Sequence, residues 1–169
     1  VQVLLHALPA DAPLDPRLII LREPSSQRAA AFRVLRHHLQ QRGDPKVIAV
    51  SSAYPGEGKT TLAINLALAL SKAGSRVGIL DGDIYGPNVP IMLGLQAQLE
   101  SDGQKIRPAE RYGLQVVSIG FMTKDEAPVI WRGPMLHSAI KQFFHDVAWR
   151  DLDYLIIDMP PGTGDVALS

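Results

Sequence analysis

The sequence predicts an α/β fold in which helices flank a mainly parallel sheet. Short apolar runs, which are typical of strands buried on both faces, alternate along the chain with longer segments of helical periodicity. A Gly-rich loop joins the first of these runs to a helix, and acidic residues follow two later runs. The 169 residues and their hydrophobic content of 46% suit one globular α/β domain.

The first part of the chain is expected to form an arm and one helix. Residues 1–24 contain four prolines, which predict an extended N-terminal arm. Ser25 or Ser26 is expected to cap a helix that ends at Gly43. Residues 25–169 are therefore expected to form the folded domain.

The rest of the chain predicts four strands, which cover about residues 46–51, 76–80, 115–119 and 154–158. Helices are expected from Leu62 to Gly74 and from Pro134 to about Val147. Residues 84–113 are rich in Gly and Pro and predict loops with a short helix. Because helices separate the strands, the sheet is expected to be parallel.

Residues 53–61 form the loop with the clearest chemical signal. It lies between an apolar run and a helix, which is the context of a phosphate-binding P-loop. The pattern G-x-x-x-x-G-K-[ST] is met from Gly58 onward, with Ala53 in place of the first glycine. Backbone N–H groups of such a loop, together with the positive end of the next helix, hold anionic phosphate. The predicted phosphate-binding residues are Pro55, Gly56, Glu57, Gly58, Lys59, Thr60 and Thr61.

Acidic residues are expected at the carboxyl ends of strands, where ligands of open α/β sheets bind. Asp158 ends an apolar run in the manner of a Walker B strand, so Thr60 and Asp158 are predicted to hold Mg²⁺. Lys59 is predicted to neutralise the β- and γ-phosphates, and Asp81 or Asp83 to orient an attacking water. The fold expected is therefore that of a P-loop NTPase that uses ATP.

The composition argues against several other functions. Lys plus Arg and Asp plus Glu both number 17, so the zero net charge does not favour a nucleic-acid partner. No apolar run approaches the ~18 residues of a membrane-spanning helix, and no signal peptide is visible, so a cytoplasmic protein is expected. The sequence has no cysteine, which excludes thiol catalysis and thiolate ligands within these residues.

Several loop motifs suggest a family. They are LDGDIYGPNVP (80–90), MLG (92–94), SIGF (118–121), VIWRGPMLH (129–137) and DYLIIDMPPGTGD (153–165). On these motifs the chain, from about residue 77 to its end, resembles the Mrp/ApbC family of P-loop ATPases. These are iron–sulfur cluster carriers related to MinD and ParA. The resemblance implies ATP binding, slow hydrolysis, a homodimer and transfer of a bound cluster to apoprotein clients.

Three features depart from that family's pattern. Tyr54 stands where the family has an early lysine that reaches the nucleotide of the partner subunit. The cluster-binding Cys-x-x-Cys of the family lies downstream of anything present, so a cluster is expected only if its ligands lie beyond Ser169. The family also continues with further strands, so we expect the chain to be truncated at its C-terminus.

Residues from about 22 to 75 suggest another group. The loop SSAYPGEGKTT (51–61) and the helix segment AFRVLR (31–36) are similar to those of bacterial tyrosine kinases that control polysaccharide export. Arg33 and Arg36 match that group's oligomerisation motif Glu-x-x-Arg-x-x-Arg, with Ala30 in place of the Glu.

Three functions therefore stay open at this point. The first is a Mg-dependent ATPase of the Mrp type that carries or assembles iron–sulfur clusters. The second is a tyrosine-kinase-like protein of polysaccharide synthesis, which would use the same site with a tyrosine hydroxyl in place of water. The third is a MinD/ParA-like positioning module in which ATP controls dimerisation only. The longer resemblance favours the first.

Overall fold

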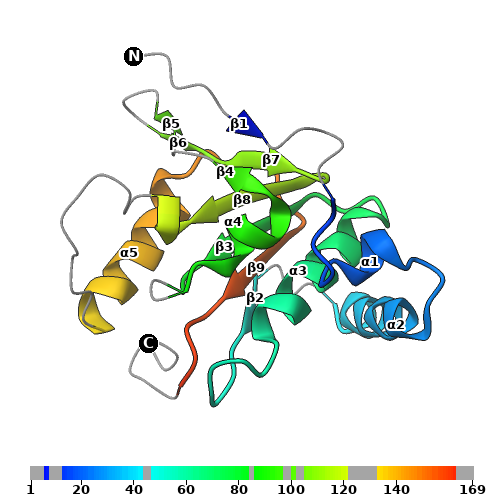
Figure 1. Cartoon of the computed structure of the whole chain (residues 1–169). Coiled ribbons are helices and arrows are strands. Elements are labelled where there is room, and N and C mark those ends of the chain that lie inside the picture. Colours follow the sequence, from blue (N-terminus) through cyan, green and yellow to red (C-terminus); the bar gives the residue numbers. More distant parts are fainter. Residues whose placement is uncertain are drawn as a thin grey trace.

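Figure 1 shows a computed structural model of the chain, in which a five-stranded sheet lies between two helical layers. The structure describes residues 6–7, 13–43, 47–83, 86–96, 100–101, 105–121 and 133–162. The strands lie in the order β2 (Val47–Val50), β9 (Tyr154–Asp158), β3 (Val77–Asp81), β8 (Leu114–Ser118) and β7 (Ala109–Arg111). The first four are parallel and β7 is antiparallel to β8, which confirms the predicted mainly parallel sheet.

Apolar side chains run along whole strands because both faces of the sheet are covered. Successive side chains of a strand point to opposite faces. In β3, Val77 and Ile79 therefore belong to one buried cluster and Leu80 to a second. The second cluster also contains Phe143, which lies on a helix of the opposite layer. This double burial is the reason that the strands lack a polar face.

Helices of different lengths form the two layers (Figure 1). α3 (Lys59–Ser71) packs on one face of the sheet, and α1 (Ile19–Arg22) and α2 (Gln27–Gln41) pack against it. α5 (Gly133–Asp146) covers the other face. No helix within the described ranges is long and apolar enough to cross a membrane.

α3 begins three residues earlier than the apolar pattern predicts. Its first residue is Lys59, with Gly58 as N-cap, whereas the pattern begins at Leu62. Hydrophobic periodicity misses the first turn because that turn carries a lysine and two threonines. The rest of the helix is buried over most of its length, as its composition predicts.

α2 agrees closely with the prediction. The side chain of Ser26 caps it by accepting a hydrogen bond from the Ala29 backbone N–H at 3.1 Å. Phe32, Leu35 and Leu39 form the face that packs on the core. α2 thus lies outside α3, on the same face of the sheet.

The described part of residues 1–24 differs from the expected extended arm. α1 lies within it, and Leu18, Ile19 and Ile20 are buried in the core. No proline interrupts this apolar run, although prolines lie on both sides of it. A single helical turn can therefore form there and pack on α3. Nearer the N-terminus, β1 (His6–Ala7) pairs with β4 (Leu95–Gln96) in an antiparallel manner.

The Gly- and Pro-rich stretch contains the short helix that was predicted, but it also contains short strands that were not, and one of them, β7, joins the main sheet. These elements are α4 (Asn88–Leu93), β4, β5 (Glu100–Ser101), β6 (Ile106–Arg107) and β7, followed after β8 by a 3-10 turn at Ile119–Phe121. Residues 84–85, 122–132 and 163–169 lie outside the described residues. Parts of the motifs at 80–90, 129–137 and 153–165 are therefore without a structural account.

Candidate functional site

The Gly-rich loop joins β2 to α3 and places its glycines where other residues would be strained. Gly56 and Gly58 have φ of 81° and 88°, which is the left-handed region. An ideal Cβ on either would meet no atom within 4 Å, so it is the backbone conformation that requires glycine here. Gly58 is also the N-cap of α3, so the loop leads directly into a helix N-terminus.

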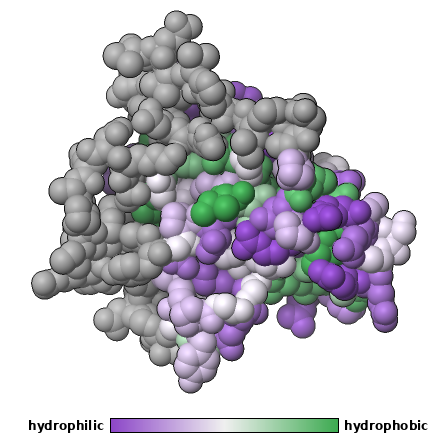
Figure 2. Space-filling view, viewed as in Figure 1, coloured by the Kyte–Doolittle hydropathy of each residue, from purple (hydrophilic) through white to green (hydrophobic). Residues whose placement is uncertain are grey.

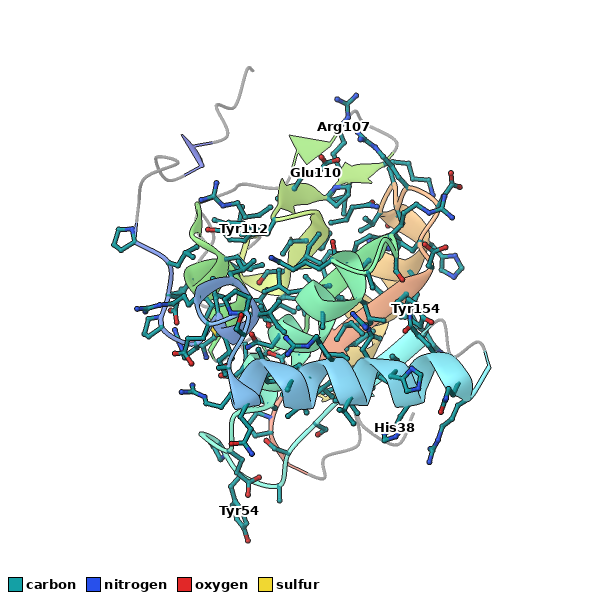
Figure 3. All side chains as sticks on the ribbon, turned by 90° about the vertical axis from the view of Figure 1, so that its right-hand side faces the viewer. His38, Tyr54, Arg107, Glu110, Tyr112 and Tyr154 are labelled. Carbon is teal, nitrogen blue, oxygen red and sulfur yellow. The ribbon has the colours of Figure 1, made fainter. Side chains whose placement is uncertain are left out.

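Polar side chains of the loop hold its shape. The Ser52 hydroxyl donates to the Tyr54 carbonyl at 2.9 Å, and the Tyr54 N–H donates to the Glu57 carboxylate at 3.0 Å. The Gly162 N–H donates to the Ser52 carbonyl at 2.8 Å, which ties the segment after β9 to the loop. The ring of Tyr54 points away from the molecule in Figure 3 and is 70% exposed. In Figure 2 the lower edge of the molecule, where the loop lies, is mostly hydrophilic to neutral.

Lys59 lies between two carboxylates at the end of this loop. Its Nζ donates to Asp83 Oδ2 at 2.8 Å and lies 3.6 Å from Asp158 Oδ1. All three side chains are at most 9% exposed. The adjacency of β3 and β9 produces this arrangement, because Asp158 ends β9 and Asp83 follows the end of β3 by two residues.

Thr60 and Asp158 form the second contact of the site. The Thr60 hydroxyl donates to Asp158 Oδ2 at 2.6 Å. Burial raises the pKa of Asp158, and the bond from Thr60 opposes that rise. Asp158 Oδ1 is buried without a hydrogen-bond partner. A hydroxyl beside a carboxylate with one oxygen that accepts no hydrogen bond suits Mg²⁺, which takes one or two carboxylates and completes its shell with phosphate and water.

Asp81 faces the interior rather than Lys59. Its Oδ1 accepts the Asp83 N–H at 3.1 Å, and its Oδ2 accepts the Val89 N–H at 3.3 Å and the Ser118 hydroxyl at 3.1 Å. Burial raises the pKa of Asp81 to about 7, although these bonds lower it. Asp81 therefore shapes the turn after β3 and directs Asp83 toward the loop.

The structure thus brings Lys59 and Thr60 together with Asp83 and Asp158, whereas Asp81 turns away to the interior. The structure also shows two polar residues that sequence reasoning missed, Ser118 beneath Asp81 and Asn65 on α3. Ser118 had one signal, since it is a polar residue at the carboxyl end of a predicted strand. Among the described residues, no group of three or more His, Cys, Asp or Glu side chains is placed to hold a metal by itself.

Comparison with known proteins also identifies a P-loop NTPase. Residues 45–169 match the ParA model, described as a NUBPL iron-transfer P-loop NTPase. The iron-sulfur cluster carrier protein of Bacillus subtilis is 48% identical over 125 residues, which are 74% of this chain and 36% of that protein. The chain thus spans little more than a third of the length of this curated relative.

Solved structures share the fold. A nucleotide-binding protein of Archaeoglobus fulgidus in complex with ADP is 36% identical, with a TM-score of 0.62 over 79% of this chain and 52% of that one. The kinase domain of the Escherichia coli tyrosine kinase ETK has a TM-score of 0.63 at 17% identity, over 85% of this chain and 59% of that domain, which shows a common fold alone.

The family match covers the P-loop, β3 and β9, and hence every residue of the site described above. The chain therefore belongs to the ParA family of NUBPL iron-transfer P-loop NTPases.

Proposed function

We propose that the chain binds ATP with Mg²⁺ at the P-loop and hydrolyses it, as the nucleotide-dependent part of an iron–sulfur cluster carrier. The observation that carries the proposal is the buried Nζ of Lys59, held between Asp83 and Asp158 beside a Gly-rich loop and a helix N-terminus. A cation in this place suits the β- and γ-phosphates of a nucleotide. The ADP bound to the Archaeoglobus fulgidus relative supports the same ligand class.

In this proposal Thr60 and Asp158 hold Mg²⁺. The Thr60 hydroxyl and Asp158 Oδ1 would provide oxygen ligands, and the ion would neutralise charge on the phosphates. Gly56 and Gly58 allow the left-handed backbone conformation of the loop. Pro55, Glu57 and Thr61 complete the loop and the first turn of α3.

Asp83 is the better placed of the two candidate water-orienting acids. When Lys59 Nζ donates to a phosphate oxygen instead of to Asp83, the Asp83 carboxylate becomes free to hold the attacking water. Both oxygens of Asp81 accept hydrogen bonds, and the one from the Asp83 N–H holds Asp83 in its position. The water would attack the γ-phosphorus as its bond to the bridging oxygen breaks, which releases ADP and phosphate.

The iron–sulfur cluster enters as cargo, suggested by the name of the carrier relative. The 169 residues hold no cysteine, so thiolate ligands must come from outside them. A homodimer, apoprotein clients and a cytoplasmic location belong to this proposal. The tyrosine-kinase and positioning alternatives would use the same site, and the ETK likeness supports the fold only.

Replacing Lys59 tests the nucleotide site. We expect Lys59→Ala to weaken binding of a fluorescent ATP analogue at least about tenfold, which is about 1.4 kcal/mol, because the phosphates lose their buried cation. Lys72→Ala, at the exposed C-terminal end of the same helix, is the matched control and should leave the affinity unchanged. Circular dichroism of both variants checks that they fold.

Equal affinity in the folded Lys59→Ala variant and the parent chain would sink the site assignment. Released phosphate, measured in the same incubation, separates the ATPase from a module that only binds ATP. Phosphotyrosine on the protein without phosphate release would instead support the kinase alternative.

A further inference from the structure

Asn65 is a buried polar side chain that the proposed nucleotide chemistry does not use. It lies on α3, is 0% exposed, and stands among apolar residues such as Ile64 and Leu66. A buried amide is costly unless its donors and acceptor are satisfied. Its partners therefore show which segments of the molecule it holds together.

The partners of Asn65 belong to two separate segments. Its Oδ1 accepts the Ile20 N–H at 3.0 Å, and its Nδ2 donates to the Arg17 carbonyl at 2.8 Å. The same Nδ2 donates to the Thr61 carbonyl at 2.8 Å. Ile20 and Arg17 belong to the N-terminal segment, whereas Thr61 is in the first turn of α3, next to Lys59 and Thr60.

The N-terminal segment is built to present these two backbone groups. Arg17 donates to both carboxylate oxygens of Asp15, and the Leu18 N–H donates to the Asp15 carbonyl, so the turn is organised before it meets α3. The Arg17 guanidinium accordingly lowers the pKa of Asp15. Leu18 and Ile20 are buried beside the contact, which excludes water from it. Figure 1 shows α1 and α2 lying against the side of α3.

We propose that Asn65 is a positioning residue that couples the docking of residues 15–22 to the phosphate-binding first turn of α3. The inference rests on the proposed nucleotide site. When the segment leaves, the Asn65 amide loses its Oδ1 partner and one Nδ2 partner, and only the bond to the Thr61 carbonyl within α3 remains. An amide with unsatisfied groups turns toward new partners, and this weakens its bond to the turn that carries Lys59 and Thr60. Nucleotide affinity therefore depends on a docked N-terminal segment.

The coupling has to act in both directions. If docking strengthens nucleotide binding, then nucleotide binding strengthens docking by the same factor. A protein partner or a neighbouring domain that pulls on residues 15–22 would then release nucleotide without touching the P-loop. The position of residues 15–22 would therefore control the nucleotide affinity of the site.

Asn65→Leu tests the coupling, because leucine has a similar volume but no hydrogen-bonding group. Two quantities are measured on the full 169-residue chain: hydrogen exchange of the amides in residues 15–22, and the affinity for a fluorescent ATP analogue. We expect exchange to accelerate at least about tenfold and affinity to fall severalfold. In the parent chain, saturating nucleotide should slow the same exchange.

A second pair of variants removes a single hydrogen bond. Ile20→Pro deletes the N–H that donates to Asn65, in the first turn of α1, where backbone N–H groups have no partner within the helix. Ile20→Ala is its control, because it shortens the side chain but keeps the N–H. We expect weaker nucleotide binding in Ile20→Pro than in Ile20→Ala. This pair decides the matter if Asn65→Leu does not fold.

Two negative outcomes are distinguishable. Faster exchange of residues 15–22 with unchanged nucleotide affinity would show that Asn65 only anchors the segment, and would overturn the coupling. A parent chain that binds no nucleotide would instead overturn the proposed function, and the coupling with it.

Discussion

The surroundings of Asp81 disfavour its charge. It is fully buried, and its pKa rises from 3.8 to about 7. Asp83, only two residues away, forms an ion pair with Lys59. The contrast arises because the chain turns after β3, so that one carboxylate stays beneath the turn and the other reaches the loop.

The raised pKa of Asp81 predicts a pH dependence of stability. The unfolded chain releases this proton near its ordinary pKa of 3.8, so between about pH 4 and pH 7 the folded state binds one more proton than the unfolded state. The free energy of unfolding contributed by this group therefore falls as pH rises through that window, by on the order of 4 kcal/mol at most, and is constant above it.

Asp81→Asn isolates this contribution, because asparagine stays neutral. Urea unfolding of both proteins across the window should show the stability of the parent falling, relative to the variant, as pH rises. Curves that stay parallel would show that Asp81 does not take up a proton in the folded state. Asp15, whose pKa is lowered, is common to both proteins and cancels from the comparison.

At the scale of elements, α2 contacts both the N-terminal segment and α3, the helix that follows the P-loop. Its two arginines that match the kinase oligomerisation motif both contact their own chain. Arg33 donates to the Pro24 carbonyl at 2.6 Å, and Arg36 donates to the Ala69 carbonyl on α3 at 3.3 Å. In this chain these guanidinium groups tie α2 to the segment after α1 and to α3.

The N-cap of α2 provides a prediction for this element. Ser26→Ala removes the acceptor for the Ala29 N–H, so we expect the free energy of unfolding to fall by about 1 kcal/mol. The exposed neighbour Ser25 serves as control, and Ser25→Ala should change stability by less than half as much. Chemical denaturation measures both. An equal loss in the two variants would mean that Ser25 shares the capping role.

At the scale of the whole molecule, β2 is an edge of the sheet. Within the described residues it pairs with β9 alone, so its other edge offers backbone groups to another chain. Val47 on this strand is 51% exposed. An edge of this kind favours strand-to-strand association between molecules.

A lysine on this edge is expected to reduce self-association. Val47→Lys should lower the fraction of associated protein in light scattering at high concentration, with little change in thermal stability. Val34→Lys is the matched control, because Val34 is 54% exposed but lies on α2. A reduction of the same size in Val34→Lys would mean that surface charge, and not the strand edge, controls association.

The sequence predicted the elements well where a local signal marks them. Ser26 is the N-cap of α2 and Gly43 directly follows its C-cap, as predicted, and the apolar runs became parallel strands. The prediction missed α1, because prolines on both sides of a short apolar run indicate an arm as readily as a buried turn. Burial against α3 decides between the two, and no local pattern contains that information.

By itself, the sequence determined the α/β class and the P-loop pattern, and it singled out the residues predicted for the site, because each depends on local order along the chain. Only the tertiary structure decided that Asp83 reaches Lys59, that Asp81 turns inward onto Ser118, and that Asn65 joins the N-terminal segment to α3. These contacts join residues 24 to 48 positions apart. Strand order and helix packing bring such residues together, and both are properties of the whole fold.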